Sequence, residues 1–96
     1  MSGGDAARVR ITVHGRVQGV WFRAHTLDAG RRFGLTGWVR NAADGTVEAV
    51  AEGPRAGCDA LVAWCHEGSP LSRVERVETR WAEPAGEFDS FEARYH

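Results

Sequence analysis

The sequence predicts an α+β fold of the ferredoxin-like kind, an α/β sandwich in which two helices cover one face of a mostly antiparallel sheet. Segments with strand or helix patterns follow the order strand, helix, strand, strand, helix, strand, strand, which is βαββαβ with an extra C-terminal strand. An Asp44-Gly45 turn signal joins the second and third strands directly as a hairpin. The 96 residues, with 43% hydrophobic content, are enough to bury one core and form one domain.

The first half of the chain contains a strand and a helix on either side of a glycine-containing loop. Apolar residues alternate with polar ones over residues 9–13, which indicates a half-buried strand. A helix is predicted over residues 22–33, with Gly34 as its C-terminal cap. The small or apolar face of this helix consists of Phe22, Thr26, Ala29, Gly30 and Phe33. Glycine inside a helix costs about 1 kcal/mol relative to alanine, so Gly30 indicates that another backbone passes close to it.

Five further elements are predicted after Gly34, each bounded by turn residues. They are strands at 36–41 and 46–52, a helix at 55–67, a strand over 74–81 and a last strand at 88–95. Helical spacing places Cys58, Leu61, Trp64 and Cys65 on the apolar stripe of the second helix. Both helices therefore have one face that can pack on a sheet.

The charge composition excludes several classes of function. The net charge is −1, so there is no basic field of the kind that binds nucleic acid. All twelve basic residues are arginines, which excludes a catalytic lysine, Schiff-base chemistry and the lysine of a P-loop. No apolar run reaches the length of a membrane span, so no membrane association is expected. His14 and His25 lack metal-ligand spacing, and we expect neither a metal nor a cofactor.

The cysteines and the N-terminus indicate a cytoplasmic protein. Cys58 and Cys65 lie seven positions apart in one predicted helix. That spacing corresponds to about 10 Å, beyond the roughly 7 Å that a disulfide spans between Cα atoms. Free cysteines fit a reducing compartment. Residues 1–7 are small and polar without an apolar signal region, which predicts a flexible N-terminus before a single domain over residues 8–96.

The loop between the first strand and the first helix is a candidate anion-binding site. Gly15 and Gly19 allow the backbone to turn its N–H groups toward one point, and Arg23 follows at the start of the helix. A cation at a helix N-terminus opposes the macrodipole, and an anion bound between the two would explain it. An ordinary turn with a solvent-exposed Arg23 is the alternative that the spacing leaves open.

Asn41 is expected at the same edge of the sheet as this loop. The first strand–helix–strand unit makes strands one and two parallel, so their C-terminal ends lie at one edge. If one strand lies between them, the separation is about 10 Å, which a small ligand and an extended Arg23 can bridge. Asn41 shares a strand face with Val39, and it points toward Arg23 if Val39 packs against the helices. Its alternative role is that of a turn residue opening the hairpin.

Taken together, the glycine-containing loop with Arg23 and the strand that ends at Asn41 resemble the acylphosphatase family. The matching segments are GRVQGVWFR (Gly15–Arg23) and GLTGWVRNAADGTVE (Gly34–Glu48). A weaker match includes Ser69-Pro70, Val74, Val77 and residues 91–95. The resemblance implies an α/β sandwich and a hydrolase acting on acid anhydrides in phosphorus-containing compounds. Such an enzyme cleaves the carboxyl–phosphate bond of small acyl phosphates to carboxylate and inorganic phosphate, without metal or cofactor.

The resemblance also assigns site residues. Arg23 matches the phosphate-binding arginine of the family, and Asn41 matches its water-positioning asparagine. The residues that match the phosphate cradle, which binds through backbone amides, are Gly15, Arg16, Val17, Gln18, Gly19 and Val20. Side-chain changes at Arg16 or Gln18 are therefore expected to matter less than a β-branched residue at position 19. Trp21, Gly30 and Ala93 depart from the family pattern without touching this chemistry. We expect a monomer.

Two other classes of protein domain are alternatives, one with the same predicted order of strands and helices and one with the same loop and Asn41 segments. RNA-recognition domains read bases with aromatic residues on the middle strands. Here the strand at 46–52 has no aromatic residue and two acids, and the net charge does not favour RNA. An acylphosphatase-like domain that binds carbamoyl phosphate within a larger maturation system is the other alternative, and a free-standing chain of 96 residues argues against it.

Overall fold

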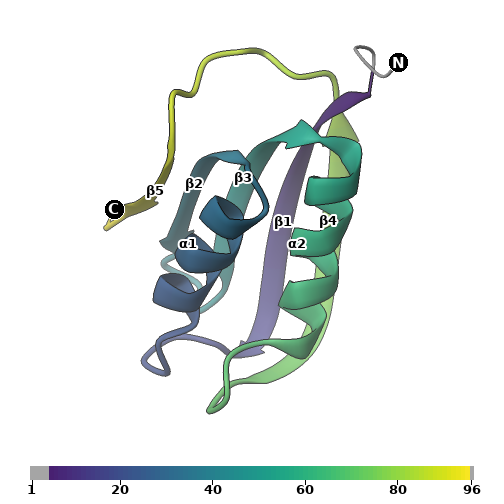
Figure 1. The fold of residues 1–96 in the computed structure, drawn as a ribbon. Coiled ribbons are helices and arrows are strands. Elements are labelled where there is room, and N and C mark those ends of the chain that lie inside the picture. Colours follow the sequence, from purple (N-terminus) through teal and green to yellow (C-terminus); the bar gives the residue numbers. More distant parts are fainter. Residues whose placement is uncertain (1–4, 96) are drawn as a thin grey trace.

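Five strands form a single sheet in the order β4-β1-β3-β2-β5, and two helices lie together on one of its faces (Figure 1). The structure is a computed structural model that describes residues 5–95. Its strands are β1 (Ala6–Arg16), β2 (Thr36–Asn41), β3 (Val47–Pro54), β4 (Arg73–Ala82) and β5 (Phe91–Arg94). Its helices are α1 (Phe22–Arg32) and α2 (Arg55–Glu67). This is the predicted ferredoxin-like fold, with a mixed sheet because β5 pairs parallel to β2.

The central strand β3 sets the relation between β1 and β2. It is antiparallel to both, so β1 and β2 run parallel, as predicted, and β3 is the one strand between them. Asn41 and Val13 are both in register with Val47 of β3. The C-terminal end of β2 therefore lies level with Val13, three residues before β1 ends at Arg16 and leads into the loop that contains Gly19.

The core lies between the sheet and the two helices. The alternation of β1 is confirmed, because Val9, Ile11 and Val13 are all buried. Phe22, Thr26 and Ala29 of α1 are buried against the sheet, as are Cys58, Leu61 and Cys65 of α2. Both cysteines are free. Desolvation by burial raises the pKa of Cys58 to about 11 and that of Cys65 to about 12, so both thiols stay protonated at neutral pH.

The two ends of the chain differ from the expected boundaries. Strand β1 begins at Ala6, which pairs with Pro54, and Ala7 is buried. Ala6 and Ala7 thus belong to the sheet, while residues 1–4 of the expected N-terminal segment lie outside the described residues. Strand β5 begins at Phe91 instead of residue 88, because residues 83–90 form an extended connection from one edge of the sheet to the other (Figure 1).

Glu52 holds this connection against the end of β3. Its carboxylate accepts hydrogen bonds from the backbone N–H groups of Ala85 (2.8 Å) and Gly86 (3.0 Å), and it pairs with Arg8 at 2.6 Å. The residue is 5% exposed. Burial alone would raise the pKa of this carboxyl, but the amides and the Arg8 guanidinium outweigh it and hold the pKa below its ordinary value.

Gly30 meets an aromatic ring and not a backbone, which corrects the expectation from the sequence. A Cβ at this position would lie 2.9 Å from three atoms of the Phe91 ring. Phe91 is 1% exposed and opens β5. The glycine therefore makes room for the ring through which β5 packs beneath α1. Neither helix within residues 5–95 is long and apolar enough to cross a membrane.

Candidate active site

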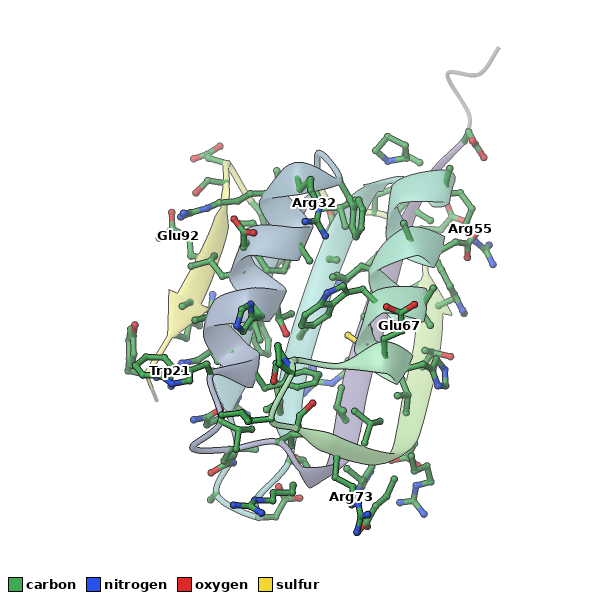
Figure 2. All side chains as sticks on the ribbon, turned by 60° about the horizontal axis from the view of Figure 1, so that its bottom comes forward. Trp21, Arg32, Arg55, Glu67, Arg73 and Glu92 are labelled. Atoms are coloured by element: carbon green, nitrogen blue, oxygen red, sulfur yellow. The ribbon has the colours of Figure 1, made fainter. Side chains whose placement is uncertain are left out.

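A pocket of about 310 Å³ opens where the loop after β1 enters α1. Its walls come from four parts of the chain: the loop, the first turns of α1, the end of β2 and the end of β5. The lining residues are Val17, Gly19, Trp21, Phe22, Arg23, Ala24, Leu27, Asn41, Ala93 and Tyr95. Figure 2 shows Trp21 at the outer edge of the molecule, beside the end of β5. The pocket thus unites the glycine-containing loop with Asn41, about twenty residues away in sequence.

Arg23 is the charged residue of this pocket. It is the second residue of α1, so its guanidinium lies at the positive end of the helix dipole. Among residues 5–95 no carboxylate lies within ion-pair distance of it. Its Cζ lies 4.1 Å from the centroid of the Tyr95 ring. A guanidinium stacked on a ring keeps the N–H groups at its edge available for an anion.

The loop backbone offers further donors. Gly19 has φ +75°, and Trp21, the residue before the helix, has φ 65° and ψ 15°. Successive turns through the left-handed region bend a chain so that its N–H groups can converge on an anion. Within residues 5–95 the N–H groups of residues 17–24 have no hydrogen-bond acceptor, and no side chain caps α1. The unsatisfied helix N-terminus and the loop amides together form a suitable cradle for a phosphoryl group.

Asn41 brings a buried acceptor to the same pocket. Its Oδ1 is buried and has no hydrogen-bond partner within the described part of the chain. Buried polar atoms are almost always paired, so this unpaired oxygen, in a residue that lines the pocket, is a candidate acceptor for a donor from a ligand or a water. The orientation arises from the strand, because Val39 of the same face is buried in the core.

The predicted cradle residues divide into two groups. Val17 and Gly19 line the pocket with Arg23 and Asn41, whereas Gly15, Arg16, Gln18 and Val20 do not. Gly15 and Arg16 belong to β1 and pair with β4 across a bulge. A Cβ on Gly15 would lie 2.1 Å from the carbonyl oxygen of Arg73, so the glycine allows close strand pairing.

Gln18 and Ser69 support the loop in ways that the sequence analysis missed. The Gln18 amide nitrogen donates hydrogen bonds to the carbonyl oxygens of Ala42 (2.7 Å) and Thr46 (2.8 Å). It thereby joins the loop to the turn that follows Asn41. The buried Ser69 hydroxyl donates to the carbonyl oxygen of Val20 at 3.1 Å. The weaker match at Ser69-Pro70 is the one sequence signal that pointed to this contact.

The histidines lie away from the pocket or at its margin. His14 pairs with Glu78 at 2.6 Å between β1 and β4, and His25 and His66 are exposed. His96 lies outside the described residues. Within residues 5–95 no group of three or more His, Cys, Asp and Glu side chains is placed to hold a metal ion.

The fold and the site together define a small ferredoxin-like α+β protein with a pocket, lined by Arg23 and Asn41, at the start of its first helix. A family model described as Acylphosphatase matches residues 9–93. The acylphosphatase of Anaeromyxobacter dehalogenans is 56% identical over 91 residues, which cover 95% of this chain and 98% of that protein. The chain belongs to the acylphosphatase family.

Solved structures agree with this assignment. The acylphosphatase from Bacillus subtilis matches with a TM-score of 0.89 and 36% identity, covering 93% of this chain and 99% of that chain. A part of HypF from T. kodakarensis matches with a TM-score of 0.81 and 28% identity, covering 94% of this chain but 12% of that chain. The chain therefore matches almost the whole length of the Bacillus subtilis acylphosphatase, but only a small part of the longer HypF chain.

Proposed function

We propose that this acylphosphatase hydrolyses the carboxyl–phosphate bond of small acyl phosphates in the pocket at the start of α1. The hydrolase activity follows from family membership, since relatives about half identical along almost their whole length are acylphosphatases. The observation that supports the residue roles is the shared pocket, which is lined by Arg23 and by Asn41, the residue whose buried Oδ1 has no partner within residues 5–95.

Arg23 and the loop amides bind the phosphoryl group. In a loose transition state, charge sits on the peripheral phosphoryl oxygens and builds up on the leaving carboxylate. Donors that are already oriented stabilise this charge without reorganising during the reaction. The loop amides of residues 17–20 and the N-terminus of α1 are such donors, and Arg23 adds a full charge at the same end of the pocket.

Asn41 positions the attacking water. A water that donates to Oδ1 satisfies this buried acceptor and is held beside the phosphoryl group. A neutral amide is a poor base, so its contribution is orientation, and the proton of the water passes to the phosphate of the substrate. The carboxylate is a good leaving group, and its departure needs neither a strong acid nor a metal.

The site is complete within one chain, which supports a monomeric enzyme. Arg23, Asn41 and the loop all belong to the same pocket of one copy. The two free, buried cysteines support a cytoplasmic location. The substrate is a small-molecule acyl phosphate, and inorganic phosphate is a product that binds the same cradle.

The RNA-recognition alternative receives no support from the open face of the sheet. Trp38, the aromatic residue of β2 on that face, is 8% exposed. It lies beneath the guanidinium groups of Arg10, Arg40 and Arg94, whose Cζ atoms are 4.8–5.9 Å from its ring centroid. Its ring is therefore covered and unavailable for stacking on a base.

Release of phosphate from benzoyl phosphate in the presence of a chelator tests the proposal. Loss of a preorganised charged donor costs about 3 kcal/mol, so we expect Arg23→Gln to lower kcat/KM a hundredfold or more. Asn41→Ala is expected to lower kcat with binding of inorganic phosphate retained. Arg32→Gln, an exposed arginine on the same helix, is the matched control. Full turnover in the Asn41 variant would exclude the water-positioning role.

A further inference from the structure

The pocket has a second, apolar half that phosphoryl binding does not use. The half that holds the anion contains Gly19, Arg23 and Asn41. The remaining wall is formed by apolar side chains, chiefly Trp21, Leu27, Ala93 and Tyr95. A water molecule, with one non-hydrogen atom, takes about 30 Å³. A phosphoryl group has one phosphorus and three oxygen atoms, so it fills only a part of a pocket of about 310 Å³.

Two of these side chains are unusually exposed for aromatic residues. Trp21 and Tyr95 each have 73% of their surface accessible to solvent. They are far apart in the sequence, directly before α1 and directly after β5, yet both line this pocket. Core packing does not explain either ring. An exposed aromatic pair beside an anion site is a typical place for a ligand group to bind.

The backbone of Trp21 strengthens this argument. With φ 65° and ψ 15°, it is the single non-glycine residue with positive φ within residues 5–95. A bulky side chain in the left-handed region costs free energy, and such strain clusters at ligand sites. Glycine or asparagine would adopt this conformation more easily. The exposed indole is thus retained at a position that local backbone preference disfavours.

Tyr95 links the apolar half to the anion half. Its ring lies 4.1 Å from Cζ of Arg23. A phosphoryl group held at the edge of that guanidinium would place the attached acyl group next to the ring. Ala93 of β5, two residues before Tyr95, lines the same pocket with a small side chain.

We propose that Trp21 and Tyr95 form an acyl-group subsite that selects aromatic acyl phosphates over acetyl phosphate. The aromatic ring of the substrate packs between the two side chains, over Ala93 and Leu27, while the phosphoryl group occupies the cradle. The inference rests on the proposed function, because it uses the Arg23 cradle to orient the substrate.

The test compares kcat/KM for benzoyl phosphate and acetyl phosphate in matched variants. Trp21→Gly removes the indole and adopts φ 65° without strain, Trp21→Phe keeps an aromatic ring, and Tyr95→Ala removes the second ring. Leu71→Ala is the control, since Leu71 is 69% exposed and lies outside the pocket. The two substrates differ in intrinsic reactivity, but this difference is the same for every variant. It therefore cancels when the benzoyl-to-acetyl ratio of a variant is compared with that of the wild type.

We expect the benzoyl-to-acetyl ratio of kcat/KM to fall about two- to twelvefold in Trp21→Gly and in Tyr95→Ala, as the loss of an aromatic contact predicts. Trp21→Phe should retain most of the wild-type ratio, and Leu71→Ala all of it. Inhibition by benzoate should weaken in Trp21→Gly and Tyr95→Ala more than inhibition by acetate, which reports the subsite without turnover.

An unchanged ratio in Trp21→Gly and Tyr95→Ala, or an equal fall in Trp21→Phe and Trp21→Gly, would overturn the subsite. That outcome differs from failure of the proposed catalytic roles. If those roles were wrong, Arg23→Gln and Asn41→Ala would keep wild-type turnover of both substrates, whatever the ratio in the Trp21 variants.

Discussion

The side-chain amide of Gln18 donates a hydrogen bond to the carbonyl oxygen of Ala42, 2.7 Å away, and so joins the loop between β1 and α1 to the residue that follows Asn41. A second bond from the same nitrogen reaches the carbonyl oxygen of Thr46 at 2.8 Å. The turn itself is tightened by Asp44, which accepts hydrogen bonds from both the N–H and the hydroxyl of Thr46. In addition to the pairing of β1 and β2 with β3, the Gln18 side chain therefore links the proposed phosphate cradle to the proposed water site.

Gln18→Ala is expected to lower both stability and turnover, which revises the expectation from the sequence that side-chain changes at position 18 matter little. It removes one of the two donors to each of two carbonyl oxygens, and the backbone N–H groups of Gly45 and Ala42 remain as donors to Ala42 and Thr46. Each lost bond costs about 0.5–1.5 kcal/mol, and Tm falls by roughly 4–8 °C per kcal/mol in a domain of this size. The water site loses its fixed distance from the cradle, so we expect kcat to fall about tenfold or more. Thermal unfolding and hydrolysis of benzoyl phosphate measure the two effects. Arg16→Ala, an exposed neighbour, is the control, and equal behaviour of the two variants would contradict this role.

Gly19→Val is expected to weaken phosphate binding. Gly19 has φ +75°, and a Cβ there would meet no atom within 4 Å, so the cost comes from the backbone and not from a clash. A β-branched residue avoids this region, and the left-handed conformation costs an L-residue about 1–2 kcal/mol. The loop is expected to shift and misalign its amides. Titration of inorganic phosphate by calorimetry measures the effect. Gly19→Asn should bind more tightly than Gly19→Val, and wild-type affinity in Gly19→Val would exclude the backbone cradle.

Gly30→Ala is expected to destabilise the protein, although alanine is the better helix former by about 1 kcal/mol. The added Cβ would lie 2.9 Å from the Phe91 ring, which is buried and cannot move without displacing β5. Overpacking of this kind costs about 1–3 kcal/mol. Urea unfolding provides the measurement. Combining Gly30→Ala with Phe91→Leu should recover part of the loss, and a gain in stability in Gly30→Ala alone would show that the ring adapts freely.

Glu52 is expected to make stability depend on acid pH. Its folded-state pKa is lowered from 4.5, so its ionised form stabilises the fold above that pH. This contribution is lost as the pH falls through the folded-state value. Glu52→Gln should reduce the free energy of unfolding by about 1–3 kcal/mol near neutral pH, because the hydrogen bonds lose their charge.

The stability gap between wild type and Glu52→Gln should be smaller at about pH 3 than at neutral pH, because the stabilisation by ionised Glu52 decreases progressively once the pH falls below 4.5. Urea unfolding at the two pH values measures this gap. Glu87→Gln is the control, since Glu87 pairs with the same Arg8 at 3.0 Å but is exposed. A gap of the same size at both pH values would show that the charge of Glu52 does not contribute.

Local patterns in the sequence determined the order of elements and several of their bounds. The predicted ranges 36–41 and 55–67 coincide with β2 and α2. Turn residues at Gly34, at Asp44-Gly45 and at 68–70 mark where β2 begins and ends and where α2 ends. Such residues can be recognised in a sequence because they act only on the dihedral angles of a few neighbouring residues. The parallel relation of β1 and β2 followed from the right-handed crossover, which is why Arg23 and Asn41 could be expected at one edge.

Only the tertiary structure decided which distant groups meet. Gln18 reaches across 24 residues to Ala42, and Ser69 across 49 residues to Val20. Phe91 occupies the space beside Gly30, Glu52 holds the 83–90 connection, and Tyr95 stacks on Arg23. Periodicity and turn residues report the burial and conformation of a segment itself. The partner of a particular polar or aromatic group depends on how the helices and the sheet pack, and that packing arises from the whole chain.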